Sequence, residues 1–235
     1  MIIDLSADLG EGAPREDEVW PLIHAANVAC GGHVGDEQSM HAAVLQARKH
    51  DVRLGAHPSY PDREHFGRRS ITMPAAQLHD ALREQLLQLY AIAAREGLAL
   101  QHVKPHGALY NDAHHDAELA TVIIDAMHAV DPSLSLVAPD TSAMAEAARG
   151  RGTNVIREAF ADRRYNADGS LLSRKEAGSL LTVDEARGQA LLLARESAVI
   201  ARDGSRLPIA FDTICIHADM EGAVERLRAI RAALS

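Results

Sequence analysis

The sequence alternates between short apolar runs and longer stretches with helical periodicity. Nearly continuous apolar runs are typical of parallel strands buried on both faces. Such runs predict strands at Ile2–Asp8, Ala25–Cys30, Val52–Ala56, Ala99–Val103, Leu134–Ala138, Asn154–Ala159 and Asp212–Ile216.

The stretches between these runs carry helix start and stop signals. After Pro74, leucines recur at helical spacing until Gly97, and Thr182 with Glu185 forms a capping box. The predicted helices begin at Gly35 or Asp36, run from Pro74 to Gly97, from Asp116 to Val130 and from Thr182 to about Ile200, and begin again near Glu221. Alternation of strands and helices implies parallel strands joined by right-handed crossovers.

Two architectures fit this alternation, a closed barrel and an open doubly wound sheet. An open nucleotide-binding sheet should show a G-x-G-x-x-G turn after its first strand, but Asp8-Leu9-Gly10-Glu11-Gly12 continues with Ala-Pro, and there is no P-loop. We therefore predict a (β/α)-barrel. Seven strands are one fewer than the common barrel has, so either one strand is irregular or the barrel is seven-stranded. Residues 1–235 are expected to form a single domain, since no linker or repeat interrupts them.

Composition narrows the class of protein. Hydrophobic residues make up 47% of the chain, enough for a large core, and the net charge of −9 argues against a nucleic-acid partner. The stretch from Arg151 to Lys175 is locally basic, with six Arg or Lys and three acids, and suits a small anionic substrate. Cys30 and Cys215 lie in apolar runs and are expected to be free thiols. Without a signal-peptide pattern or an apolar run of membrane length, we expect a cytoplasmic protein that does not bind membranes.

Polar and ionisable residues gather where the predicted strands end. In a (β/α)-barrel these ends converge on one face, where such enzymes keep their active sites. One such histidine is usually structural, but six strand ends together favour an enzyme. The candidates are Asp8 and Glu11; Asn27, His33 and Asp36; His57; Lys104 and His106; Glu158, Asp162 and Arg163; and His217 and Asp219.

Several of these residues have both a functional and a structural interpretation. The loop at 55–69 carries three arginines and Tyr60, which are candidates for binding a carboxylate or phosphate; the alternative is a solvated loop with surface arginines. Residues 158–171 are a candidate lid over an anion or an ordinary surface loop. Lys104 is either an anchor for negative charge, a base if its pKa is lowered, or the partner of Glu158 or Asp8 in a structural ion pair.

Five segments together resemble one known family. They are Asp-Leu-Gly-Glu at 8–11, Asn-Val-Ala-Cys-Gly-Gly-His at 27–33, Gly-Ala-His-Pro-Ser-Tyr-Pro-Asp-Arg at 55–63, His-Val-Lys-Pro-His-Gly-Ala-Leu-Tyr-Asn at 102–111 and Glu-Ala-Phe-Ala-Asp-Arg-Arg-Tyr at 158–165. In order and spacing they resemble the lactam-utilisation family, the A component of the bacterial ATP-dependent 5-oxoprolinase, from residue 2 to about 219. The resemblance implies a seven-stranded barrel similar to that of glycoside hydrolases and polysaccharide deacetylases.

The resemblance also implies a reaction: 5-oxo-L-proline, ATP and water give L-glutamate, ADP and phosphate, with the help of subunits B and C. Because this chain has no nucleotide motif, we expect ATP to be a co-substrate handled by the partners, which would activate the lactam. The expected base is Asp8 or Glu11 helped by His57, with Lys104 steadying the phosphorylated oxygen. Expected substrate-binding residues are Asn27, His33, Arg63, His106, Asn111, Glu158, Asp162, Arg163, His217 and Asp219.

Two other functions remain open at this point. A metal-dependent amide or carbohydrate hydrolase, including a deacetylase, could use Asp8, His33, His57 and His217 as ligands to a divalent metal, although no H-E-x-x-H pair is present. A non-catalytic subunit could instead hold a lactam for its partners. Metal analysis of the purified protein would distinguish the metal-dependent hydrolase from the 5-oxoprolinase component. The effect of pocket mutations on the rate of hydrolysis would distinguish a non-catalytic subunit from an enzyme.

Overall fold

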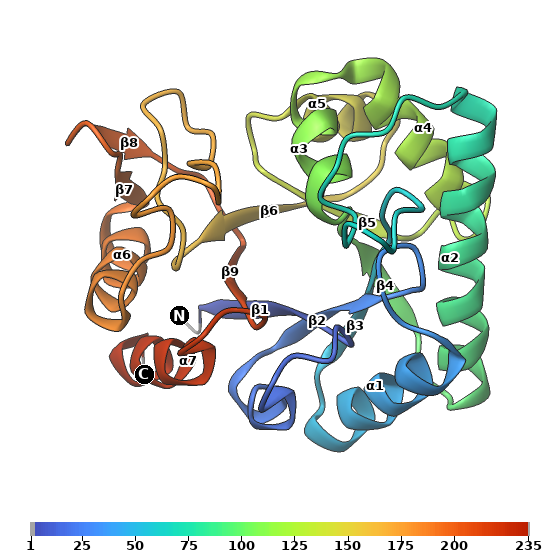
Figure 1. Ribbon diagram of the computed structural model, residues 1–235, viewed down its shortest axis with the longest axis horizontal. Helices are drawn as coiled ribbons and strands as arrows, with labels where there is room; N and C mark the ends of the chain where they lie inside the picture. The colour runs from blue at the N-terminus through green and yellow to red at the C-terminus, as the bar shows by residue number, and fades with distance from the viewer. Residues whose placement is uncertain (1–2, 235) are drawn as a thin grey trace.

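The computed structural model describes residues 3–234, whose centre is a closed barrel of seven parallel strands (Figure 1). The strand order is β1-β2-β3-β4-β5-β6-β9, and β9 closes the barrel by pairing with both β6 and β1. The strands are β1 (Asp4–Leu9), β2 (Ala25–Ala29), β3 (Arg53–His57), β4 (Leu100–Val103), β5 (Ser135–Ala138), β6 (Val155–Phe160) and β9 (Thr213–His217). The seven-stranded prediction is confirmed, because this closure leaves no position for an eighth barrel strand.

All seven predicted strands are present, with ends that shift by one or two residues; Ile2, at one predicted end, lies outside the described residues. The prediction missed an antiparallel hairpin of β7 (Ala198–Ile200) and β8 (Arg206–Pro208). It extended the preceding helix to Ile200, but that helix ends at Glu196 because Ser197 has a left-handed backbone with φ of 48°. The apolar residues after Ser197 continue the helical spacing, which concealed the break.

Helices surround the outside of the barrel (Figure 1). They are α1 (Glu37–His50), α2 (Ala75–Arg95), α3 (Gly107–His115), α4 (Ala117–His128), α5 (Ala143–Gly150), α6 (Val183–Glu196) and α7 (Ala223–Leu234), with 3₁₀ turns η1 (Glu16–Glu18) and η2 (Trp20–Leu22). The side chains of Asp36, Asp116 and Thr182 cap α1, α4 and α6, and Thr182 forms the predicted capping box with Glu185. Pro74 is the N-cap of α2 and not its first residue, and the short helices α3 and α5 were not predicted.

Inside the barrel, Gly55 on β3 packs closely against the imidazole of His102 on the neighbouring β4. A Cβ atom at Gly55 would lie 2.0 Å from Nε2 of His102, so only glycine leaves room for this ring. Glycine inside a strand often marks such a close approach or a bulge. Here it does both, because the register between the two strands shifts at Leu54 and Gly55.

Two further expectations concern the whole chain. Cys30 and Cys215 are both buried and free, as predicted. Among the described residues, no helix is both long and apolar enough to cross a membrane.

Candidate active site

A cavity of about 1260 Å³ lies over the C-terminal ends of the barrel strands. Ten of the predicted site residues line it: Asp8, Glu11, His57, Lys104, His106, Asn111, Glu158, Arg163, His217 and Asp219. The four other predicted residues, Asn27, His33, Arg63 and Asp162, do not line the cavity. Any part they have in the site must come through contacts with neighbouring residues. The location agrees with the position of active sites in (β/α)-barrels.

The floor of the cavity is a buried lysine between two carboxylates. Nζ of Lys104 lies 3.0 Å from Oδ1 of Asp8 and 2.8 Å from Oε1 of Glu158. Tyr110, which also lines the cavity, donates a hydrogen bond of 2.8 Å to Oε2 of Glu158. All three charged side chains are less than a tenth exposed, so their charges act on one another in a medium of low polarity.

The pKa values of Lys104 and Asp8 are set by the attraction between opposite charges at the floor of the cavity. Burial by itself would lower the pKa of Lys104, but Asp8 and Glu158 outweigh this and hold that pKa well above its ordinary value. Burial would likewise raise the pKa of Asp8, but His57 and Lys104 hold it well below its ordinary value. The alternative in which a lowered pKa makes Lys104 a base is therefore wrong. Lys104 forms the structural ion pair with both carboxylates, and its ammonium group also lines the cavity.

Asn27 holds Asp8 in position from inside the barrel. Its Nδ2 donates to Oδ1 of Asp8 over 2.8 Å, and Nε2 of His102 lies 2.8 Å from its Oδ1. Since burial lowers the pKa of His102 to about 3, its ring is neutral and donates through Nε2. Asp8 and Asn27 face each other in the register of β1 and β2, which explains the contact. Asn27 is thus a support for Asp8 below the cavity.

Two histidines in contact share one extra proton. Nδ1 of His57 lies 2.7 Å from the carbonyl oxygen of Lys104, and Nε2 of His106 lies 2.9 Å from that of Phe66. Carbonyl oxygens only accept, so both nitrogens carry hydrogen. The remaining contact of 3.0 Å, between Nε2 of His57 and Nδ1 of His106, then requires a second proton on one ring. Burial lowers the pKa of His106 to about 2, whereas for His57 the charge of Asp8 outweighs burial and raises the pKa. His57 is therefore the imidazolium.

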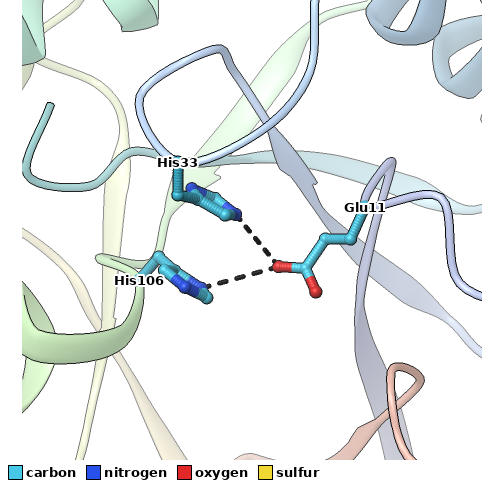
Figure 2. A group of neighbouring side chains, drawn as sticks. All are labelled: Glu11, His33 and His106. Atoms are coloured by element: carbon cyan, nitrogen blue, oxygen red, sulfur yellow. Dashed lines mark hydrogen bonds and ion pairs between the residues drawn. The ribbon is translucent and has the colours of Figure 1, made fainter. Parts of the chain in front are cut away.

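Glu11 faces a stacked pair of imidazole rings (Figure 2). Its Oε1 lies 3.0 Å from Nε2 of His33 and 3.5 Å from Nδ1 of His106. Burial raises the pKa of Glu11 to about 7, against the opposing effect of His57. A carboxyl group with a pKa near neutrality is suited to accepting and returning a proton.

The same three side chains are the best candidates for holding a metal ion. One donor atom from each of Glu11, His33 and His106 lies within 4.8 Å of the others. However, the two rings are parallel, at 3° and with centroids 3.7 Å apart, so their in-plane lone pairs meet at one ion only if the rings turn. The ligand set predicted from the sequence is not brought together, because His33 contacts Glu11 whereas His217 is bonded to Asp162.

His217 and Asp162 form a dyad on another wall of the cavity. The carboxylate of Asp162 accepts from the backbone N–H of His217 at 2.8 Å and lies 3.1 Å from its Nδ1. Burial would raise the pKa of Asp162, but His217 outweighs it and keeps the carboxylate ionised. Phe160 stacks against the imidazole at 5.4 Å. Asp162 is wholly buried behind the histidine, so only His217 reaches the cavity.

For the anion, sequence reasoning singled out Arg63 and not Arg68, Arg157 or Arg174, which line the cavity. Arg63 donates to the carbonyl oxygens of Gly31 and Gly35 and so ties two loops together away from the cavity. Arg68 and Arg174 both pair with Asp219, the latter at 3.0 Å. The sequence does point to the loop that contains Arg68, because this loop carries three arginines. It does not tell which of the three arginines turns toward the cavity.

Arg163 lines the cavity but uses its guanidinium to hold the segment at 161–182. It donates to the carbonyl oxygens of Leu172 and Ser179 at 2.6 and 3.3 Å. Burial lowers the pKa of Arg163 to about 10, so the group still carries its charge at neutral pH. The basic stretch predicted to cover an anion thus forms a wall of the cavity, fastened by one of its own arginines.

The fold and the site together define this chain as a (β/α)-barrel protein with a ring of ionisable side chains at the C-terminal ends of its strands. Residues 3–235 match the model of the LamB/YcsF family, and the chain belongs to that family. This confirms the resemblance to lactam-utilisation proteins read from the sequence.

One solved structure agrees with this assignment. A lactam utilization protein from Thermus thermophilus is 41% identical, covers 100% of this chain and 96% of its own, and superimposes with a TM-score of 0.92. A protein from Enterococcus faecalis, described as a putative cellobiose-phosphate cleavage protein, is 10% identical over 99% of this chain and 90% of its own, with a TM-score of 0.54; it shares the fold alone. A family 4 carbohydrate esterase from Streptomyces lividans, in complex with acetate, has 12% identity, coverage of 99% and 87%, and a TM-score of 0.48.

Proposed function

We propose that this chain is the lactam-hydrolysing component of an ATP-dependent 5-oxoprolinase. In this proposal, partner subunits B and C transfer the terminal phosphoryl group of ATP to the lactam oxygen, and this chain opens the ring to give L-glutamate. The 41% identity to a lactam utilization protein along the whole chain supports the substrate class. The observation that carries the chemistry is the buried ammonium group of Lys104 in a cavity that Glu11 also lines.

The proposed roles follow from the charge of each side chain and from the polar atoms that its contacts within the protein leave available. An amide resists water because of its resonance, and phosphorylation of the oxygen makes the ring carbon electrophilic. Lys104 and His57 supply positive charge for the phosphorylated oxygen. Glu11 takes the proton of the attacking water. Asp8 is a weaker candidate for this base, because Asn27 and Lys104 already occupy its oxygens.

For the carboxylate of 5-oxoproline we propose Arg68 and Arg174 in place of Arg63 and Arg163. Both residues line the cavity, and the ion pair that each forms among residues 3–234 is with the same carboxylate, that of Asp219, whereas Arg63 and Arg163 are engaged by backbone carbonyls. Two arginines around one acid leave positive charge for a second anion.

This assignment predicts a selective loss of affinity. Replacing Arg68 or Arg174 with alanine should raise the KM for 5-oxoproline by about tenfold or more, since a charge-assisted pair contributes about 1.5–3 kcal/mol. The same variants should turn over 2-pyrrolidinone, which lacks the carboxylate, as the wild type does. Equal losses with both lactams would contradict a role in carboxylate recognition. Arg63→Ala, in the same loop as Arg68 but away from the cavity, is the control variant.

The test of the proposed function is glutamate formation from 5-oxoproline and ATP by this chain alone, by subunits B and C alone, and by all three together. Turnover in the full mixture only is the expected result. The proposal fails if no mixture forms glutamate while B and C are folded and hydrolyse ATP.

A second candidate function, metal-dependent hydrolysis of an amide or an acetylated carbohydrate, rests on the Glu11, His33 and His106 donors. Elemental analysis of the purified chain tests it. A divalent metal bound in equimolar amount, and lost together with hydrolysis on Glu11→Gln, would favour this function over the ATP-dependent one.

A further inference from the structure

The roles proposed above do not include the His217–Asp162 dyad, although its contacts are as well defined as those of Lys104 with Asp8 and Glu158. Asp162 is completely buried and accepts both from the backbone N–H and from Nδ1 of His217. A carboxylate in this position keeps the hydrogen on Nδ1 and fixes the orientation of the imidazole ring. The side chain is only 11% exposed, and it lines the cavity with the edge that Asp162 does not use.

His217 is also placed beside the floor of the site. His217 and Asp8 are partners in the register of β9 and β1, and paired residues of neighbouring strands lie side by side on the same face of a sheet. Glu11 and His57 approach the same floor from the loop after β1 and from the end of β3. A ring bound over Lys104 therefore has Glu11 and His57 on one side and His217 on another.

We propose that His217 is the proton donor to the ring nitrogen and that Asp162 is its positioning residue. This assignment rests on the proposed function. It concerns a choice that the chemistry forces on this chain: the adduct of water with a phosphorylated lactam has two leaving groups on one carbon. Which of them departs decides whether ATP is used productively.

The two collapses of this adduct differ in the bond that breaks. If the C–O bond to phosphate breaks, the electron pair leaves with phosphate, the hydroxyl loses its proton, and 5-oxoproline is regenerated. If the C–N bond breaks, the pair moves to nitrogen, which takes the proton from Nε2 of His217, while the hydroxyl becomes a carbonyl and loses its proton to water. The product is then an acyl phosphate, and a second water converts it into glutamate and phosphate.

Protonation is what makes the second collapse competitive, because an amide anion is a far poorer leaving group than phosphate. A general acid at the nitrogen contributes about 10²–10⁴-fold to such a step. Loss of His217 should therefore not stop the addition of water. It should divert the adduct toward loss of phosphate, so that ATP is consumed while the lactam returns unopened.

The experiment measures phosphate and glutamate together in the assembled complex containing wild-type chain, His217→Asn or Asp162→Asn. His79→Asn, on the outer helix α2, serves as the control because its ring pairs with Asp80 at the surface, away from the cavity. The wild type and the control should release about one phosphate per glutamate. In His217→Asn the ratio should rise at least tenfold, and Asp162→Asn should raise it in the same direction. Circular dichroism establishes that each variant is folded.

Labelled water identifies the collapse itself. In ¹⁸O-enriched water the His217→Asn complex should return 5-oxoproline that carries the label, because phosphate departs with the original oxygen. Equal falls in phosphate and glutamate in both folded variants, or unlabelled 5-oxoproline with label in the phosphate alone, would overturn the role of His217. Absence of glutamate with the wild-type chain would instead overturn the proposed function, and the role of His217 with it.

Discussion

Lys104→Met is expected to abolish most turnover of the assembled complex and to destabilise the fold. Methionine is similar in size but carries no charge, so Asp8 and Glu158 would remain buried without their shared partner. Breaking a buried ion pair by removing one member costs about 3–5 kcal/mol. Loss of a preorganised charge near a reacting oxygen lowers kcat by about 10²–10³-fold. Urea unfolding and glutamate formation measure the two effects separately.

A compensated variant separates the structural part of this prediction from the catalytic part. Lys104→Met combined with Asp8→Asn and Glu158→Gln removes the uncompensated charges and should recover most of the lost stability. Turnover should stay low, because no ammonium group faces the phosphorylated oxygen. Recovery of turnover in this triple variant would show that Lys104 serves the fold alone.

Gly55→Ala is expected to destabilise the protein strongly, although the change adds a single methyl group. The new Cβ would lie 2.0 Å from Nε2 of His102 and 2.2 Å from its Cδ2, inside the barrel, where both strands are hydrogen-bonded on each side. Overpacking of this kind costs about 1–3 kcal/mol or more. Displacement of His102 would also break its contact with Asn27 and thereby loosen Asp8, so turnover should fall as well.

The matched control is Gly188→Ala in α6, where nothing lies within 4 Å of the added atom. There the substitution should stabilise by about 0.5–1 kcal/mol, because glycine is unfavourable in a helix. Adding His102→Ala to Gly55→Ala should restore part of the lost stability by removing the clash. If Gly55→Ala cost no more than Gly188→Ala in denaturant unfolding, close packing against His102 would not be the reason for glycine at this position.

The candidate site shows where prediction from sequence stops. The strand ends identified nine of the residues that line the cavity, because a polar side chain at the end of an apolar strand has a recognisable pattern, and the family resemblance added Asn111. Arg68 and Arg174 have no such pattern: each lies in an irregular segment, and only the folded loops bring them to Asp219. His102 looks like another strand residue in sequence, yet its partner Asn27 is 75 residues away.

By itself, the sequence determined the barrel, the end of the barrel at which the ionisable side chains gather, and the family of the chain. These follow from local periodicity, from strand ends and from motif order, which are properties of neighbouring residues. Only the tertiary structure decided which residues act in pairs: that Lys104 stays charged, that Glu11 has a pKa of about 7, and that His217 is held by Asp162. The physical reason is that desolvation and Coulomb interactions depend on distances between strands, and barrel closure sets those distances.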